Sequence, residues 1–363
     1  MLVNKLYDRW HFHQRMNNKV AYNLEKLREI SATSQNKQAI LDALHPWRVS
    51  PNLRYHNTWS FFLLAACIVN VVLITLYFSH YPLIVTVVWI GAIFIACFAY
   101  FSIEKQSEVD TEIAKLETQV FQYQYQVNFA RFPSFNTQAG MNPNYMLARV
   151  RQGFACLNQG NAGNEIVDFA STTWQVQGHD FPVLLFQYVA TMEVAMTNGK
   201  GEQITKQIEK NYWGACVFDM PALAFFVSNE KQKHARYPVE WRSSDAQFNR
   251  DFQLYGQQEF ELAKNLTPSR ILTLAHQLED MRGTLMFHDE MQVFCYISSQ
   301  NIFQTRSCAK TIQNISQLRG HLRTLKAPHY ERLQANLEAV IASFMDERVF
   351  LPAEQIMQFD GSN

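Results

Sequence analysis

The chain has no excess of charge of one sign, because its 363 residues include 32 Lys or Arg and 32 Asp or Glu. We therefore expect no nucleic-acid partner held by bulk positive charge. Charged residues make up only 18% of the chain and hydrophobic residues 48%, which excludes a chain that is disordered throughout.

The sequence also lacks the motifs that mark common catalytic and metal sites. No two of its six cysteines form a Cys-x-x-Cys pair, so we expect no metal, and a reducing compartment rather than a disulfide framework. The phosphate-binding Gly-x-x-x-x-Gly-Lys-Ser/Thr loop and the Gly-x-Ser-x-Gly elbow are missing as well. We accordingly expect no cofactor and assign no catalytic residue.

Two long apolar runs are the most prominent features that the sequence does contain. Residues Trp59–Ser79 and Leu83–Ile103 carry no formal charge, and each run is long enough to cross a bilayer as a helix. Only three residues separate them, so we expect a transmembrane hairpin with both ends on one side. Arg48, Arg54 and Lys105 flank the pair, whereas the turn has no Lys or Arg, which predicts cytoplasmic termini.

Three residues in these runs are candidates for helix–helix contact. Asn70 lies near the middle of the first run, where an amide without a partner is costly, and Ala92 and Ala96 form a small-xxx-small pair in the second. They either pack within one hairpin or form the contact of a homo-oligomer. A conducting pore is not expected, because one polar residue does not line a water path.

Helices are expected on both sides of the hairpin, which itself covers residues 56–103. Residues 1–55 predict one or two amphipathic helices. Residues 104–132 predict a coiled-coil-like stalk continuous with the second span, because apolar residues recur in steps of four and three from Val109 to Val127. The mate of this stalk is either the N-terminal helix, folded back antiparallel, or the same stalk of a second subunit.

Residues 133–363 predict a self-contained domain of the α+β class. Segments rich in β-branched and aromatic residues between positions 165 and 227 predict an antiparallel meander, with a hairpin turn at Asn198-Gly199. A second hairpin is expected around Asp289-Glu290, and two helices are expected to close the chain on either side of Ala327-Pro328.

One cluster of basic residues stands out in this C-terminal region. Arg319, Arg323 and Lys326 are expected to share a helix face at steps of four and three, with Arg306 and Lys310 shortly before them. Near an anionic leaflet such a face could bind lipid head groups. The alternative is a solvated face whose charge is balanced elsewhere in the fold.

A pattern of aromatic and turn residues runs through the expected domain. Its members are Trp213–Phe218, Phe248, Phe252, Leu254, Tyr255, Leu266-Thr267-Pro268, Phe287, Val293–Ile297 and Ile302-Phe303. With these residues and the two preceding spans, the chain resembles the bacterial domain-of-unknown-function family numbered three-one-three-seven over roughly residues 60 to 325. The resemblance implies a two-span inner-membrane protein with a cytoplasmic α+β domain, and it supplies no catalytic residue.

Hypotheses of different classes remain open. The first is a non-enzymatic binding or scaffold protein at the cytoplasmic face of the inner membrane, whose partner is a protein or a lipid. The second is a membrane-tethered sensor or enzyme with a site of dispersed residues such as His179, Asp180, Glu240 and Arg242. A weaker third hypothesis is an oligomeric membrane-active effector assembled through Asn70 and the face that carries Ala92 and Ala96.

Overall fold

The protein divides into two compact units, which are described separately. The computed structural model describes residues 2–77, 80–133, 143–197, 199, 203–229, 235–279, 281–305 and 311–345. Residues 1–124 and 305–326 form the first unit, here called the helical unit, and residues 125–304 and 327–363 form the second, here called the sheet domain. The segment 305–326, expected to belong to the α+β domain, thus groups with the helices that precede it.

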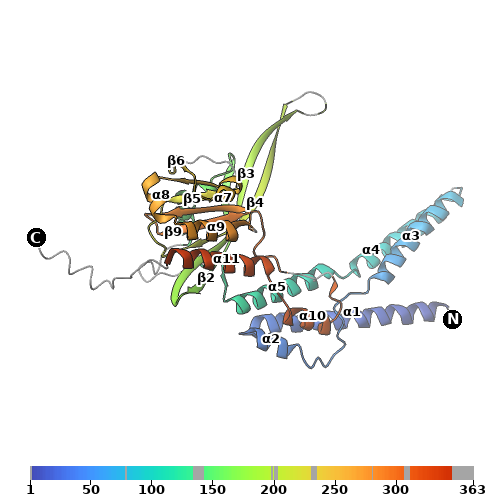
Figure 1. Ribbon diagram of the computed structural model, residues 1–363. Helices are drawn as coiled ribbons and strands as arrows, with labels where there is room; N and C mark the ends of the chain where they lie inside the picture. Colours follow the sequence, from blue (N-terminus) through green and yellow to red (C-terminus); the bar gives the residue numbers. More distant parts are fainter. Residues whose placement is uncertain are drawn as a thin grey trace, which may run out of the picture. The chain divides into compact units, whose positions relative to one another are not determined.

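Helices dominate the helical unit (Figure 1). They are α1 (Leu2–Thr33), α2 (Lys37–Ala43), α3 (Thr58–Tyr77), α4 (Pro82–Phe101), α5 (Gln106–Tyr125, whose last residue belongs to the sheet domain) and α10 (Ile315–Arg323). Helices α3 and α4 coincide with the two apolar runs and pack against each other, as a helical hairpin requires.

Helix α1 lies beside α5 in the same chain, but the two helices run parallel, so the antiparallel pairing expected from the sequence is wrong. Near the start of α5, Arg28 pairs with Glu108 at 3.1 Å between Nη2 and Oε2. Near its end, the Tyr123 hydroxyl donates to the Ser34 carbonyl at 2.7 Å. Residue numbers therefore rise together along both helices.

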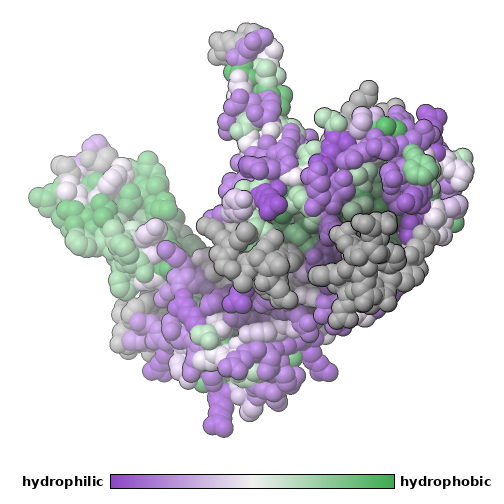
Figure 2. Space-filling view, turned by 90° about the vertical axis from the view of Figure 1, so that its left-hand side faces the viewer, coloured by the Kyte–Doolittle hydropathy of each residue, from purple (hydrophilic) through white to green (hydrophobic). Residues whose placement is uncertain are grey.

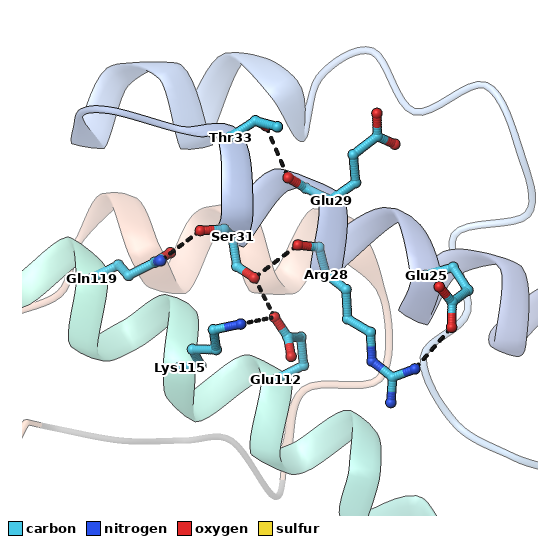
Figure 3. Close-up of polar contacts among 8 residues, drawn as sticks. All are labelled: Glu25, Arg28, Glu29, Ser31, Thr33, Glu112, Lys115 and Gln119. Atoms are coloured by element: carbon cyan, nitrogen blue, oxygen red, sulfur yellow. Dashed lines mark hydrogen bonds and ion pairs between the residues drawn. The ribbon is translucent and has the colours of Figure 1, made fainter.

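Polar side chains, as well as apolar ones, hold α1 to α5 (Figure 3). The buried Ser31 hydroxyl donates to Glu112 at 2.5 Å, and the Gln119 amide donates to the Ser31 carbonyl at 2.6 Å. Lys115 lies 3.4 Å from the same Glu112 carboxylate. Leu27 of α1 and Val120 of α5 are apolar and fully buried. The stalk helix thus finds its mate within its own chain.

The parallel arrangement follows from an extended segment that returns along α1. After α2, residues 45–57 run back to the start of α3, and the buried Asn23 amide donates to the carbonyls of Ser50 and Asn52 at 2.7 and 2.8 Å. The Trp47 indole N–H donates to the Asn23 side-chain oxygen at 3.1 Å. Because this segment covers the return distance, α1 and α5 can point the same way.

The second apolar helix does not continue into the stalk, contrary to the sequence expectation. Helix α4 ends at Phe101 and α5 begins at Gln106. At the break, the Asn57 amide donates to the Glu104 carbonyl at 2.8 Å and accepts from the Glu104 N–H at 3.2 Å. This pair of bonds to Asn57 replaces the helical hydrogen bonds that the Glu104 backbone would otherwise make.

The sheet domain is built on nine antiparallel strands in the order β1-β2-β3-β4-β9-β8-β5-β7-β6. The strands are β1 (Asn128–Phe129), β2 (Gly163–Val176), β3 (His179–Thr197), β4 (Gln203–Val217), β5 (Phe225–Ser228), β6 (Val239–Trp241), β7 (Gln253–Gly256), β8 (Gly283–His288) and β9 (Val293–Ser298). With the helices below, this confirms the α+β class.

Both faces of the sheet are covered, because successive strand residues point to opposite sides. Phe225 and Phe287 pack on Phe344 of α11 on one side. Their neighbours in the strands, Phe226 and Met286, belong to the core cluster under α6 on the other side of the sheet. The helices and the 3-10 turn of this domain are α6 (Pro143–Gly153), η1 (Ala155–Leu157), α7 (Ala246–Asp251), α8 (Glu259–Asn265), α9 (Pro268–Glu279) and α11 (Pro328–Met345).

Strands β3 and β4 extend beyond the rest of the sheet as a two-stranded ribbon (Figure 1). The expected hairpin is confirmed, since Thr197 pairs with Gln203, although Asn198 lies outside the described residues. Beyond Thr191, where β2 stops pairing with β3, one face of the ribbon is largely apolar. That face carries Met192, Val194, Met196, Ile204, Lys206 and Ile208.

Candidate functional site

A polar cleft of about 700 Å³ opens in the sheet domain beside the end of β8. Three segments that are distant in sequence form it, namely the end of α6 with η1, the residues before β6, and β8 itself. Its lining residues are Gln152, Gly153, Ala155, Asn158, Gln159, Ala235, Arg236, Tyr237, Met286 and His288.

Arg236 brings a positive charge to the cleft and holds it next to two carboxylates. Its Nη2 atom lies 2.6 Å from Asp289 and 3.5 Å from Glu290. Burial alone would raise the pKa of Asp289, but the hydrogen bonds from Arg236 and from the backbone of Glu290, together with the positive charge of Arg236, outweigh burial and hold that pKa below its ordinary value. The charge of Arg236 is therefore largely balanced by its neighbours.

His288 is a buried and neutral member of the cleft, with a side chain that is only 5% exposed. Its Nδ1 atom accepts a hydrogen bond from the Met291 N–H at 3.3 Å, which leaves the proton on Nε2. Burial, and then the positive charge of Arg236, lower the pKa of His288. The imidazole therefore serves as a neutral hydrogen-bond donor at neutral pH.

Three buried cysteines lie next to the floor of the cleft. Cys216 and Cys295 are register partners on β4 and β9, and Cys156 interacts with Cys295 through its thiol. No sequence pattern groups them, because the pairing of β4 with β9 and the packing of η1 on the sheet bring them together. The hydrogen bond to Cys295 and burial raise the pKa of Cys156, so this thiol stays protonated. Within the described residues, no group of three His, Cys, Asp or Glu side chains could hold a metal ion.

The polar groups of the cleft are largely paired with other groups of the protein. Arg236 is neutralised by carboxylates, His288 is neutral, and the Tyr237 hydroxyl is engaged with the Phe287 carbonyl at 2.7 Å. The hairpin expected around Asp289-Glu290 is confirmed by the pairing of β8 with β9, but nothing in the sequence linked Arg236 to it.

The four dispersed residues considered for an enzyme site do not converge. His179 and Asp180 begin β3 and are exposed beside the β2–β3 turn, whereas Glu240 and Arg242 lie in or just after β6 and are exposed. Five strands separate β3 from β6 in the sheet. At about 4.8 Å per strand, these groups cannot act on one substrate.

The structure places the three basic C-terminal residues in different environments. Arg319 donates from Nε to the Leu41 carbonyl at 3.0 Å, so it connects α10 to α2. Arg323 is exposed at the last position of α10, and Lys326 is exposed beyond the end of that helix. The expected common helix face therefore does not include Lys326. Arg306 and Lys310 lie outside the described residues.

The candidate contact residues of the apolar hairpin also differ from one another. Ala92 and Ala96 are half-buried and share a face of α4 with the buried Ala99. Asn70, in contrast, is exposed on α3. The alanines thus take part in packing within the hairpin, whereas Asn70 does not.

Comparison of the chain with family models, with curated proteins and with solved structures finds no match.

Proposed function

We propose that the protein is a membrane-anchored, non-enzymatic binding protein, held by α3 and α4 at the cytoplasmic face of a bacterial inner membrane. The observation that carries the proposal is the exposure of these two helices. Both are long and apolar enough to cross a bilayer. Of the 18-residue apolar stretch in each helix, only 0% in the first and 6% in the second is buried within the protein. In the more distant part of Figure 2 they form a continuous hydrophobic surface.

This exposure argues against a role as core helices of a soluble fold. Phe61, Leu76, Phe94 and Phe98 are each more than half exposed, and such a surface in water would drive aggregation. Lipid chains solvate it without cost, and the helices satisfy their own backbone hydrogen bonds. The length of α3, 20 residues, corresponds to the roughly 30 Å thickness of the hydrocarbon layer.

Fractionation of the full-length protein tests the anchor. We expect the protein to stay with the membrane pellet after extraction at alkaline pH and to enter solution only with detergent. The exposed Leu272 of α9 offers a control, because Leu272→Arg leaves α3 and α4 unchanged and should not alter the fractionation. Recovery of the full-length chain in a detergent-free supernatant would contradict the proposal.

The proposed binding surface of the helical unit is the exposed pair Arg323 and Lys326, with an anionic partner. Lys37 donates to both the Gln124 side chain and the Arg323 carbonyl, at 2.8 and 3.3 Å. Arg323 therefore lies beside the end of α5 that is distant from α4. At 1.5 Å per residue, the helix from Gln106 to Gln124 spans about 27 Å, more than the Debye length of about 8 Å. This placement favours an anionic partner protein over the lipid head groups also considered for Arg319, Arg323 and Lys326.

Hydrogen exchange distinguishes the two kinds of partner. If lipid is bound, amides of residues 311–330 should exchange more slowly in nanodiscs with anionic lipid than in neutral ones, and Arg323→Glu with Lys326→Glu should abolish the difference. We expect no such difference. Slower exchange of these amides in anionic nanodiscs that is lost in the double variant would contradict the protein partner and show that lipid binds instead.

Membership in the domain-of-unknown-function family three-one-three-seven is likewise a proposal, supported by the residue pattern from Trp213 to Phe303. The structure gives one member of the pattern a physical reason. A Cβ atom at Gly214 would lie 2.1 Å from the Tyr296 carbonyl oxygen and 2.8 Å from the Phe186 ring, so only glycine fits.

A further inference from the structure

We propose that two copies of this chain associate within the bilayer through the outer face of α3, with the two Asn70 amides hydrogen-bonded to each other. The inference rests on the proposed membrane anchor, because an amide without a partner is costly in lipid and not in water. It concerns a surface that the hairpin itself leaves uncovered.

Packing within the hairpin uses a different face of α3. Ser60 and Cys67 are buried, and Leu63, Val71 and Ile74 are half-buried, at the helical spacing of one continuous stripe. Asn70 borders this stripe, three residues after Cys67 and four before Ile74, but its own side chain is exposed. The hairpin contact therefore forms without the asparagine.

The neighbouring polar groups of the hairpin are already paired with each other. The Trp89 indole N–H donates to the Thr75 hydroxyl at 3.1 Å, and that hydroxyl donates to the Val71 carbonyl at 2.7 Å. Within the described chain, the Asn70 amide has no hydrogen-bond partner. Its two donors and its acceptor are therefore available at mid-membrane depth.

The surface around Asn70 has the composition of a transmembrane helix contact. Ala66 lies one turn before Asn70 and would allow two backbones to approach closely. Leu73 and Tyr77 lie on the same side of the helix and are 47% and 77% exposed. Residues 66, 70, 73 and 77 recur at steps of four, three and four, which is the spacing of a helix–helix seam.

A second copy fits this surface better than lipid does. Acyl chains offer no hydrogen-bonding group, whereas an amide is both donor and acceptor and is therefore complementary to itself across a twofold axis. Each Asn70 would donate to the carbonyl oxygen of the partner's Asn70. Every copy of the chain carries this residue at the same depth, so the required partner is always present.

Cysteine cross-linking of the full-length protein in native membranes tests the proposed contact. In a background with Cys67→Ala and Cys97→Ala, Leu73→Cys should form a disulfide-linked dimer on mild oxidation. Ile68→Cys is the matched control, because Ile68 is 65% exposed but lies on the opposite side of α3. Equal cross-linking at both positions, or none at Leu73→Cys, would overturn the inference.

The amide itself is tested by substitution. We expect Asn70→Val to raise the dimer dissociation constant in detergent micelles about tenfold, and Asn70→Gln to retain most of the association. Thr75→Val removes a polar group that is used inside the hairpin, so it should leave the dimer dissociation constant unchanged. Insertion is measured in the same membranes: an inserted monomer overturns only this inference, whereas a protein that is not inserted overturns the proposed anchor as well.

Discussion

At the scale of single residues, Gly214 occupies a position where no side chain fits. Strands β3, β4 and β9 pack there around the Phe186 ring, and the glycine lies opposite Phe186 in the β3–β4 register. We expect Gly214→Ala to lower the free energy of unfolding by about 3 kcal/mol, because backbone atoms must move to admit the methyl group. Denaturation of the detergent-solubilised protein measures this loss.

A glycine in open space provides the comparison for this substitution. Gly320 lies within α10, and a Cβ atom there would meet nothing within 4 Å. Gly320→Ala should therefore stabilise the protein slightly, because alanine favours the helix by up to about 1 kcal/mol. Equal effects of the two substitutions would show that the packing around Gly214 is looser than described.

His288 should make the stability of the sheet domain depend on pH. Burial and Arg236 lower its pKa from the ordinary 6.5, so the unfolded chain binds a proton at a pH where the folded chain does not. The free energy of unfolding should therefore fall as the pH is lowered from 7 towards 5. His288→Asn should give a flatter profile over this range, as measured by denaturation at each pH.

The exposed His276 provides the control for that profile. His276→Asn should leave the slope between pH 7 and 5 as it is in the unaltered protein. Asp289 does not confuse the result, since its pKa lies below 3.8 and its contribution is lost only at lower pH. An unchanged slope in His288→Asn would contradict the assignment of His288 as a buried neutral group.

Sequence patterns identified some residues of the cleft and could not identify others. The turn at Asp289-Glu290, which follows His288, was recognisable because both sides of it are strand-like. Arg236 and Cys156 were not, because both lie outside the strands and no periodicity links residues that only tertiary packing brings together. Asn23 was missed for the same reason, since its partners are carbonyls in a segment without regular structure.

At the scale of elements, Asn23 is the residue that holds the returning segment to α1. It is fully buried and bonds two carbonyls and the Trp47 indole. We expect Asn23→Leu to destabilise the helical unit by about 3 kcal/mol, because several buried polar groups lose their partner. Limited proteolysis should then cut after Arg48 much sooner than in the unaltered protein.

Asn18, which is exposed on the same helix, is the control for this substitution. Asn18→Leu should leave the rate of cleavage after Arg48 unchanged. If Asn23→Leu were cleaved no faster than Asn18→Leu, the segment would be held by other contacts.

Heptad spacing predicted that a helix exists between Gln106 and Tyr125, but it could not predict the direction of its partner. Apolar steps of four and three are the same read from either end, so parallel and antiparallel pairing look alike. The direction depends on residues 45–57, which carry no periodic pattern. The break between α4 and α5 likewise depends on one distant residue, Asn57.

At the scale of the whole molecule, we expect a two-span anchor whose turn and stalk helix α5 lie on opposite sides of the bilayer. The charge bias around the apolar runs predicts the turn outside and the stalk inside. His80 lies in the turn between α3 and α4, and Thr118 is exposed on α5, so the two positions report on the two sides.

Labelling of introduced cysteines in intact cells tests this claim most directly. In a background with Cys67→Ala and Cys97→Ala, a membrane-impermeant thiol reagent should label His80→Cys in intact cells and Thr118→Cys only after the membrane is opened. Labelling of Thr118→Cys in intact cells, or equal labelling of both before and after opening, would contradict the account.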